Sequence, residues 1–488
     1  MTAARIAIKD VRFFMRNVRT RMPFKYGVAT LTSVPILHVR LEGELDDRQA
    51  QGWAADILPP KWFDKDPEKE YEDNVDDLIA VARAAADAYA SAAKTPHSVF
   101  DIWHAGYQQT LAFGDANGLN HLTASHGSSL LERALIDAVG CVLGLTYSQM
   151  LAANALGFDL GRVHDELRGV EPVDVLPRQP LDHIAVRHCV GLADPIRRGD
   201  IAAADALEDD LPQALEDYIQ EQGLTHFKVK VNGDLEADIE RLSRVASLLH
   251  ERCSECAVTL DGNEQYAEME GFQELLARLE HANDQELARF YERIIYLEQP
   301  LERSVALDSG LETGIRAMAD RKTMLIDESD GDLDSFKRAV ALGYTGVSSK
   351  NCKGLIKAVM NQALASHYSQ RSGNGRLFFL SGEDLMNLPV VPLHQDLTHA
   401  AALGIAHVER NGHHYVRGLD HLSDSERAAC VRDHASLYTE RERGLVALNI
   451  QSGQLDVRSL SRVPGLGSGP DVDADSMTPL EEWTFQSL

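Results

Sequence analysis

The sequence predicts an α/β protein in which a modified (β/α) barrel, as in TIM barrels, carries an N-terminal α+β capping domain. Two observations indicate this fold. In residues 171–435, short β-rich segments alternate with longer helical segments about eight times, which is typical of a parallel sheet. In residues 1–170, alternating strand patterns are followed by alanine-rich helical periodicity. Eight repeats favour a closed barrel over an open sheet, because closure removes both sheet edges.

The capping domain is expected to span residues 1–170. Residues 5–13 and 34–42 alternate apolar and polar side chains, as paired strands do. Between them, residues 20–32 contain Pro and Gly and are expected to form a loop. Residues 66–160 have helical periodicity. This region therefore predicts strands followed by helices.

The barrel is expected to span residues 171–435, and residues 436–488 are expected to return to the cap with a hairpin at 447–460. An insert around residues 270–292 is interpreted as a surface helix extension without chemistry. The eight expected barrel strands are HIAVRHCV (183–190), THFKVKV (225–231), CAVTLD (256–261), IIYLEQP (294–300), TMLIDES (323–329), TGVSSK (345–350), RLFFLS (376–381) and GIAHVE (404–409).

Composition and charge exclude several kinds of partner. The chain has 75 acidic and 48 basic residues and a formal net charge of -27, which argues against nucleic acid or an anionic membrane. We find no signal peptide and no apolar run long enough to span a bilayer. The 6 cysteines are scattered, which suggests reduced thiols in the cytoplasm. Cys253 and Cys256 lack the second pair that a zinc site needs.

Charged residues fall where the expected strands end. Lys228 and Lys230 alternate with apolar residues in one strand, so their side chains share a face. The next four strands end in Asp261, Glu298, Asp327 and Lys350. Any single carboxylate of this kind is more often a helix cap, and alternating lysines are more often on a solvated edge. Six such residues on successive strands favour a functional site, because the carboxyl ends of barrel strands form its floor.

These residue types suit one kind of chemistry. Three carboxylates make an all-oxygen site for Mg²⁺, with Mn²⁺ as the alternative ion. The lysines could act as acid and base, since desolvation, a neighbouring ammonium and a nearby cation lower a lysine pKa. The metal would stabilise the charge that develops when a proton leaves the carbon next to a carboxylate. The pattern therefore predicts abstraction of a proton α to a carboxylate.

At these motifs the chain resembles the enolase superfamily, and within it the muconate-lactonizing-enzyme subgroup (mandelate racemase/muconate lactonizing enzyme-like). The resemblance extends almost end to end. The matching barrel segments are FKVKV (227–231), TLDGNEQY (259–266), YLEQPL (296–301), LIDES (325–329) and GVSSKNCKG (346–354). Outside the barrel the matches are TRMPFKYGVATLT (20–32), SLLERALIDAVGCVLG (129–144) and PGLG (464–467).

The resemblance implies a role for each matching residue. It implies that Lys230 is the acid/base on one face of the substrate and Lys350 its counterpart on the other face. Lys228 is implied to lower the Lys230 pKa and to help hold the substrate carboxylate. A Lys base with Mg²⁺ is known chemistry for this superfamily. A small carboxylate substrate and a homo-oligomer are implied as well. The implied Mg²⁺ ligands are Asp261, Glu298 and Asp327.

Three departures narrow the resemblance. The sixth strand ends in Lys350 and the seventh carries no His, which disfavours mandelate-racemase-like members. Residues 52–60 stand where relatives often carry a Gly-x-Gly-Glu turn, so the second lid loop of the cap is altered. Residues 406–415 lack the Asp-x-Asp that dipeptide epimerases use to hold the substrate amine.

Further residues are weaker candidates. Lid aromatics in cap loops could contact substrate, although such residues more often pack locally. Glu383 could set specificity, and Asn263 and Gln299 flank metal ligands. The aromatic candidates are Tyr26, Trp53 and Trp62. No carboxylate or Cys pattern supports a zinc site at the remaining pairs, which are expected to be core or surface histidines: His394, His399, His413 and His414.

The sequence leaves the outcome of the reaction open. An isomerase (racemase, epimerase or muconate-cycloisomerase-like) and a lyase share the same first step. A metal-dependent hydrolase on a similar barrel would need His ligands near strand ends, and we identify none from the sequence. A binding or scaffold protein could keep the same site without catalysis.

Overall fold

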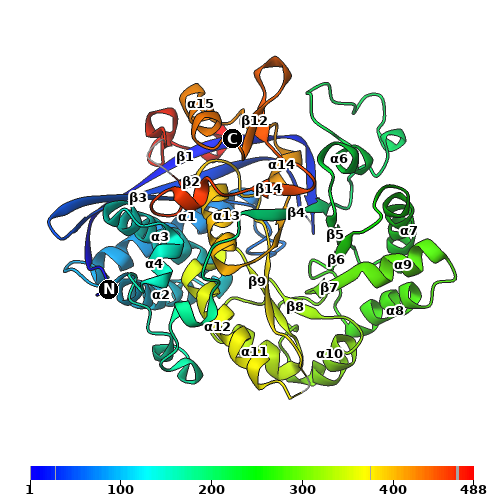
Figure 1. Ribbon diagram of the computed structural model, residues 1–488, viewed down its shortest axis with the longest axis horizontal. Coiled ribbons are helices and arrows are strands. Elements are labelled where there is room, and N and C mark those ends of the chain that lie inside the picture. The colour runs from blue at the N-terminus through cyan, green and yellow to red at the C-terminus, as the bar shows by residue number, and fades with distance from the viewer. Residues whose placement is uncertain (1, 28, 374, 469–471) are drawn as a thin grey trace.

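The computed structural model describes residues 2–27, 29–373, 375–468 and 472–488. It confirms the predicted fold class, with a closed parallel barrel beside an N-terminal antiparallel sheet and its helices (Figure 1). Among the described residues, the search for an apolar helix of bilayer-spanning length finds none.

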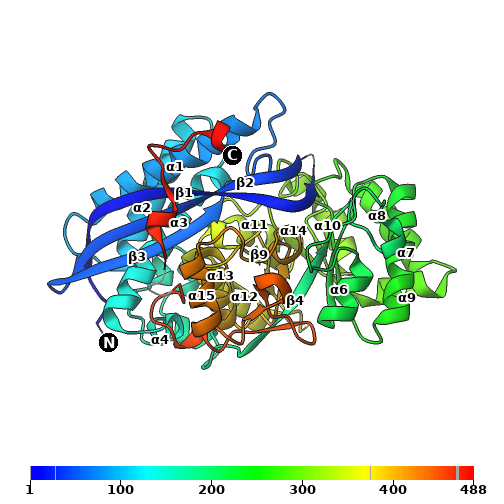
Figure 2. The same cartoon turned by 90° about the horizontal axis from the view of Figure 1, so that it is seen from above.

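The cap consists of a four-stranded antiparallel sheet, in the order β15-β1-β2-β3, and three long helices. Helix α3 is buried along most of its length because it packs against β3 and the other two helices. Figure 2 shows the long strands β1 and β2 extending over the barrel. The elements are β1 (Ile6–Tyr26), β2 (Ala29–Leu45), β3 (Arg48–Ile57), α1 (Tyr71–Ala92), α2 (Val99–Ala116), α3 (His121–Leu143) and α4 (Tyr147–Ala152).

Residues 20–32 do not form the predicted loop. Strand β1 continues to Tyr26 and β2 begins at Ala29, while position 28 lies outside the described residues. The strand pairing is interrupted between Arg19 and Phe24, the interval that contains Pro23. Because proline has no N–H to donate, it is tolerated at such an irregularity. The Pro and Gly signals therefore mark an irregular hairpin.

The segment that begins at Gly52 is also strand, up to Ile57 in β3. A Cβ on Gly52 would lie 2.1 Å from the carbonyl oxygen of Ala134, so only glycine allows α3 to approach this closely. Trp53 follows in the same strand and packs against the ring of Phe14. The prediction that Trp53 lies in a cap loop is therefore wrong, because Gly52 lies within β3 and does not end the strand.

The barrel strands match the eight predicted segments, and each pairs in parallel with the next. Strand β11 pairs with β4 and closes the barrel. The strands are β4 (His183–Val190), β5 (His226–Lys230), β6 (Ala257–Asp261), β7 (Ile294–Glu298), β8 (Met324–Ile326), β9 (Gly346–Ser349), β10 (Phe379–Gly382) and β11 (His407–Arg410).

Helices surround the barrel as the alternating pattern predicts. The predicted insert forms α8 and α9, whose buried Phe272 and Phe290 attach both helices to the outer layer. The helices are α5 (Pro172–Val175), α6 (Leu215–Gln222), α7 (Leu235–Arg252), α8 (Met269–Glu280), α9 (Gln285–Arg293), α10 (Glu312–Ala319), α11 (Ser335–Leu342), α12 (Leu355–Arg371), α13 (Val391–Leu403), α14 (Gly412–Tyr415) and α15 (Asp424–Asp433).

The expected hairpin at 447–460 is confirmed only at its turn, where Gln451 and Gln454 form an antiparallel bridge. Strand β13 (Val446–Leu448) pairs with β12 (Tyr438–Glu440), whereas β14 (Gln454–Asp456) pairs with the start of β4. Strand β5 pairs with β4 only from Arg187 onward, so the first residues of β4 are free to pair with β14 on the same side. Strand β15 (Thr478–Pro479) then pairs with β1 in the cap. The C-terminal segment thus contacts both the barrel and the cap.

Candidate active site

Charged side chains meet at the carboxyl ends of the barrel strands. Lys230, Asp261 and Glu298 are the last residues of β5, β6 and β7. Asp327 and Lys350 directly follow β8 and β9. All five side chains are buried. Because the strands are parallel, the structure brings this predicted set to one end of the barrel.

Lys228 lies among four carboxylates. Its Nζ donates hydrogen bonds to Glu298 Oε1 (2.8 Å) and Glu383 Oε2 (2.9 Å). It also donates to Glu409 Oε2 (3.0 Å) and lies 3.1 Å from Asp261 Oδ2. Burial opposes the charge, but the carboxylates outweigh it and raise the pKa of Lys228 well above its usual value. Lys228 therefore stays protonated.

Glu298 experiences the opposite effect. Burial, together with the negative charges of Asp261 and Glu383, raises the pKa of Glu298 well above its usual value. Lys228 is the one cation among the main influences on this carboxyl group. The carboxyl groups around Lys228 therefore disfavour a further negative charge at Glu298.

Lys230 lies nearer the cap side of this network. Its Nζ donates to Asp261 Oδ2 (2.9 Å) and to the side-chain oxygen of Asn263 (2.7 Å). The backbone N–H of Asn263 in turn donates to Asp261 Oδ1 (2.8 Å). Asn263 is thus fixed by the same carboxylate that holds the lysine.

Asp327 is surrounded by cations. Lys350 Nζ lies 2.5 Å from Asp327 Oδ2, and Lys353 Nζ lies 2.8 Å from Oδ1. The hydroxyl group of Ser348 also donates to Oδ1. Burial alone would raise the pKa of Asp327, but the two lysines hold it well below the usual value. This side of the site is therefore rich in positive charge.

Glu383 joins the site to the barrel interior. Arg187, from β4, donates to Glu383 and to the carbonyl oxygen of Gly382 (2.9 Å). Burial opposes ionisation, yet Arg187 and Lys228 hold the Glu383 pKa well below its usual value. Glu383 was predicted as a specificity residue. It is not among the side chains that line the cavity described below.

A cavity of about 440 Å³, including space open to solvent, lies between the barrel and the cap. Apolar and aromatic side chains of the cap and of the segment after β10 form one wall, including Phe24, Trp62 and Met386. The polar wall includes Lys228, Lys230, Asp261, Asn263, Lys350 and Glu409. The site therefore combines a charged floor with an apolar roof.

Direct contacts with carboxylates dominate the pKa values of Lys230 and Lys350. Burial lowers the pKa of Lys230, and Lys228 acts in the same direction, but Asp261 outweighs both. For Lys350, Asp327 likewise outweighs burial. Both pKa values lie above the usual value. Burial and Lys228 thus act on the Lys230 pKa in the expected direction, and the net rise at each lysine comes from its direct contact with a carboxylate.

The donor set fits a divalent cation by its chemistry. Asp261, Glu298 and Asp327 are buried carboxylates on successive strands, and hard cations prefer oxygen ligands. Glu298 Oε2 has no hydrogen-bond donor, although Lys228 Nζ approaches it to 2.8 Å as an ion pair. Across the described residues, these three carboxylates do not converge within 4.8 Å. A shared ion therefore requires these side chains to move closer together, and each of them now contacts a lysine.

The remaining candidates occupy different places. Tyr26 ends β1, lines the cavity and donates to the carbonyl oxygen of Pro60 (2.8 Å). Trp62 also lines it, with Lys350 Nζ 4.5 Å from its ring centre. Gln299 instead accepts a backbone hydrogen bond from Asp327 (2.7 Å) and orients that residue. Trp53 does not line the cavity.

Sequence reasoning missed several residues of the site. Glu409 lies in the eighth strand and could have been found by the same strand-end rule that found Glu298. Asp384 and Met386 follow β10 and line the cavity. Lys353 lies in a short turn after β9, where no periodic signal marks it.

The histidines separate into two groups. His394 hydrogen-bonds to Tyr438 and His399 to Tyr147, so both are core residues as expected. His413 and His414, however, meet His188 from β4. No local sequence pattern predicts this meeting, because His188 is 225 residues away from His413.

Solved structures resemble this arrangement over nearly its full length. A muconate lactonizing enzyme from Mycobacterium smegmatis is 17% identical, with a TM-score of 0.61 over 97% of this chain and 100% of that chain. One from Pseudomonas fluorescens is 16% identical, with a TM-score of 0.57 over 98% and 97%. The chain has the fold of a muconate lactonizing enzyme. The predicted resemblance is thereby confirmed at the level of the fold.

The same fold extends to other solved proteins. A dipeptide epimerase from Methylococcus capsulatus, complexed with Mg and a dipeptide, is 18% identical with a TM-score of 0.54. It aligns over 94% of this chain and 99% of its own. No protein-family model and no curated protein sequence matches the chain. At these identities the muconate-lactonizing-enzyme fold is shared, and the chemistry must be argued from the site.

Proposed function

We propose that this protein is an enolase-superfamily enzyme that removes the proton α to the carboxylate of a small substrate. One observation carries the proposal: Lys230 and Lys350 line a single cavity from two different strands. Strands β5 and β9 are four places apart in a closed barrel of eight, so they lie on opposite sides. A substrate between them would present one face to each lysine.

Asp261, Glu298 and Asp327 are the residues that would hold Mg²⁺, with Mn²⁺ as the alternative. Their burial and oxygen donors support this assignment. When bound, the cation would supply stabilisation of the negative charge that forms on the substrate carboxylate. Gln299 would keep Asp327 oriented through its backbone contact.

The two lysines would divide the proton transfer. Lys230 Nζ and Lys350 Nζ are both protonated in the arrangement described, since Asp261 and Asp327 raise their pKa values. A lysine in this form can donate a proton to the substrate carbon. The other lysine acts as base only after its ammonium has lost a proton. Lys228, held among carboxylates, would remain a fixed positive charge.

The apolar roof suggests the kind of substrate. Phe24, Trp62 and Met386 favour a carboxylate with an apolar or aromatic body. Racemisation, muconate-cycloisomerase-like ring chemistry and elimination all begin with the same proton abstraction. The side chains of the roof would select among these outcomes.

The proposal is tested by α-proton exchange in D₂O with Mg²⁺, followed by mass spectrometry over a library of carboxylates. We expect exchange on at least one acid. Lys230→Ala and Lys350→Ala should each reduce it by about 10²–10⁴-fold, the usual contribution of a general acid or base. The exposed Lys94→Ala is the matched control and should leave exchange unchanged.

Two results would oppose the proposal. Exchange that persists in both lysine variants would show that Lys230 and Lys350 do not transfer the proton. Mg²⁺ binding without exchange on any acid would instead favour a binding or scaffold protein. That alternative has support in the structure, because lysines contact Asp261, Glu298 and Asp327 directly.

A further inference from the structure

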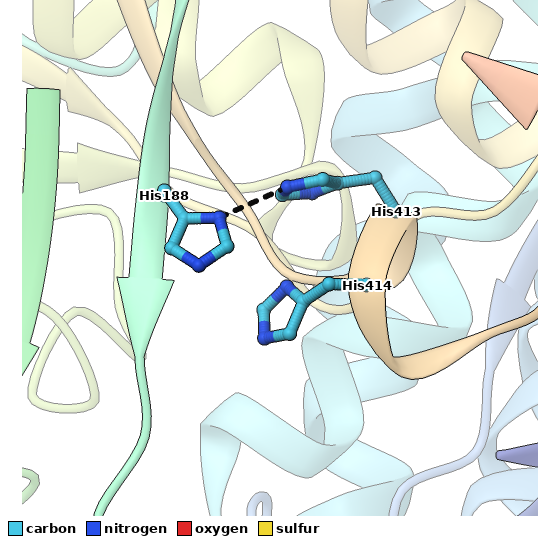
Figure 3. A group of neighbouring side chains, drawn as sticks. All are labelled: His188, His413 and His414. Carbon is cyan, nitrogen blue, oxygen red and sulfur yellow. Dashed lines mark hydrogen bonds between the residues drawn. The ribbon is translucent and has the colours of Figure 1, made fainter. Parts of the chain in front are cut away.

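Three histidines, one on β4 and two on α14, lie side by side, as Figure 3 shows. One ring nitrogen from each of His188, His413 and His414 lies within 4.8 Å of the other two. The ring centres of His188 and His414 are 4.5 Å apart, and those of His188 and His413 are 5.0 Å apart. We call this group the histidine cluster.

The fold explains why these residues meet. Arg187 and His188 are consecutive in β4, so their side chains point to opposite faces of the strand. Arg187 points inward to Glu383, and His188 points outward to the ring of Tyr218 in α6. His413 and His414 lie in α14, just after the neighbouring strand β11. The histidine cluster therefore joins two adjacent strand exits.

The cluster contains buried nitrogens without hydrogen-bond partners. His188 Nδ1 and His413 Nε2 are 3.0 Å apart and share one hydrogen bond. His413 Nδ1 and both ring nitrogens of His414 are buried without any hydrogen-bond partner. His188 is 2% exposed and His414 is 1% exposed. Native proteins rarely leave such groups unsatisfied, and a bound ion is one of the recognised explanations.

A carboxylate lies behind the cluster. Asp194 Oδ2 is 3.6 Å from His414 Nε2, and it accepts a hydrogen bond from the Tyr415 hydroxyl at 2.7 Å. Metal-bound histidines commonly present their second nitrogen to such a carboxylate, which fixes the ring orientation. Asp194 is therefore placed to orient His414.

We propose that His188, His413 and His414 bind a divalent transition-metal ion such as Zn²⁺, oriented by Asp194. Three imidazoles suit Zn²⁺, Cu²⁺ or Ni²⁺, whereas Mg²⁺ prefers oxygen ligands. In a tetrahedral Zn²⁺ site with bonds of about 2.0–2.1 Å, ligand nitrogens lie about 3.3 Å apart. The observed limit of 4.8 Å is within reach of side-chain rotation. This site is independent of the proposed carboxylate chemistry.

The ion would stiffen one wall of the cavity. Tyr415, the residue after His414, stacks on Phe24 with ring centres 4.1 Å apart. Phe24 and Asn411 both line the cavity, and Asn411 directly precedes α14. Fixing α14 to β4 would therefore fix part of the substrate wall. The ion would act through structure, because no histidine is among the side chains described as lining the cavity.

The test is calorimetric titration of chelator-treated full-length protein with Zn²⁺ in excess Mg²⁺, which saturates any oxygen site. We expect one Zn²⁺ per chain, with a rise in melting temperature. His188→Ala and His414→Ala should abolish this binding. Asp194→Asn should weaken it by about 10–100-fold, the usual effect of losing such a supporting carboxylate. His183→Ala, half-exposed in the same strand, is the matched control and should bind normally.

A second measurement guards against variants that fail to fold. X-ray absorption on Zn²⁺-loaded wild type should show imidazole nitrogens at about 2.0–2.1 Å. An absence of Zn²⁺ binding in excess Mg²⁺ would overturn the proposal, and the cluster would then be a set of packed core histidines. A ligand shell of oxygen alone, or unchanged binding in His188→Ala, would overturn it as well.

Discussion

The two sides of the candidate site are electrostatic opposites. Around Lys228, one ammonium group lies among four carboxylates, which come from β6, β7, β11 and the residue after β10. On the β8–β9 side, one carboxylate, that of Asp327, is held by Lys350 and Lys353. The same residue types therefore have opposite roles about the barrel axis.

This difference determines which groups carry charge. The Glu298 pKa is raised well above the usual value by burial and by neighbouring carboxylates. The Asp327 pKa is held well below it by two lysines, although burial acts in the other direction. The carboxyl groups around Lys228 thus repel one another's negative charge, and a cation bound there would relieve that repulsion. The β8–β9 side offers positive charge to an anionic substrate.

The largest expected effect comes from Asp327→Asn. The amide keeps the shape but leaves the buried ammonium groups of Lys350 and Lys353 without their closest counter-charge. We expect the free energy of unfolding to fall by about 3–5 kcal/mol, because breaking a buried ion pair strands a charge. Urea denaturation at pH 7 measures the change.

The matched variant on the opposite side is Glu298→Gln. Lys228 would retain three carboxylates, and a carboxyl group that ionises reluctantly would be removed. We therefore expect the unfolding free energy to change by less than about 1 kcal/mol. Equal losses in the two variants would contradict the electrostatic opposition.

A pH-dependent effect is expected at Glu328, beside Asp327. Burial, followed by the charge of Asp327, raises the pKa of Glu328 from 4.5 to about 7. Between these values the folded state binds a proton that the unfolded state has released, so stability falls as pH rises through this range. Glu328→Gln removes that loss. The free energy of unfolding of Glu328→Gln minus that of wild type should therefore rise by about 3 kcal/mol between pH 4 and pH 8.

Urea unfolding at both pH values tests this expectation. The exposed Glu302→Gln is the control and should follow wild type. If the difference between Glu328→Gln and wild type did not change with pH, the carboxyl group would not be the buried, proton-binding group inferred for this side.

The smallest effect concerns Trp62. Its ring supports the Lys350 ammonium group from 4.5 Å on the side where carboxylates are scarce. A double-mutant cycle of Trp62→Leu with Lys350→Met should give a coupling energy of about 1–2 kcal/mol. The same cycle with Trp53→Leu should give less than about 0.5 kcal/mol, since Trp53 packs against Phe14. Similar coupling energies in both cycles would contradict a specific cation–π interaction between Trp62 and Lys350.

Local pattern explains how much of the fold could be predicted. A strand such as 226–230 is a short apolar run between helical patterns, and eight such runs indicated the barrel. Local pattern also indicated the turn at 451–454, but it could not predict that β14 pairs with β4, far away in the sequence. Pro23 gave the same signal for a loop and for an irregular strand. Non-local pairing leaves no mark in local periodicity.

The site shows the same limit. The strand-end rule located Asp261, Glu298 and Asp327, because barrel geometry gathers strand ends regardless of their side-chain partners. It could not predict that Asp327 would contact Lys353, since that contact depends on how the turn after β9 folds. His188 was missed because it lies in the first barrel strand, whereas its partners lie in α14, which follows the last barrel strand.

The pairing of β15 with β1 has a consequence for synthesis on the ribosome. Trp483, just after β15, donates a hydrogen bond to Asn17, 466 residues earlier. At about 5–20 residues per second, roughly 20–90 s pass before that edge of β1 meets its partner. Unpaired edges invite aggregation, and charged side chains discourage it. Strand β1 carries Lys9, Arg12, Arg16, Arg19 and Arg21, which would protect the nascent edge during that interval.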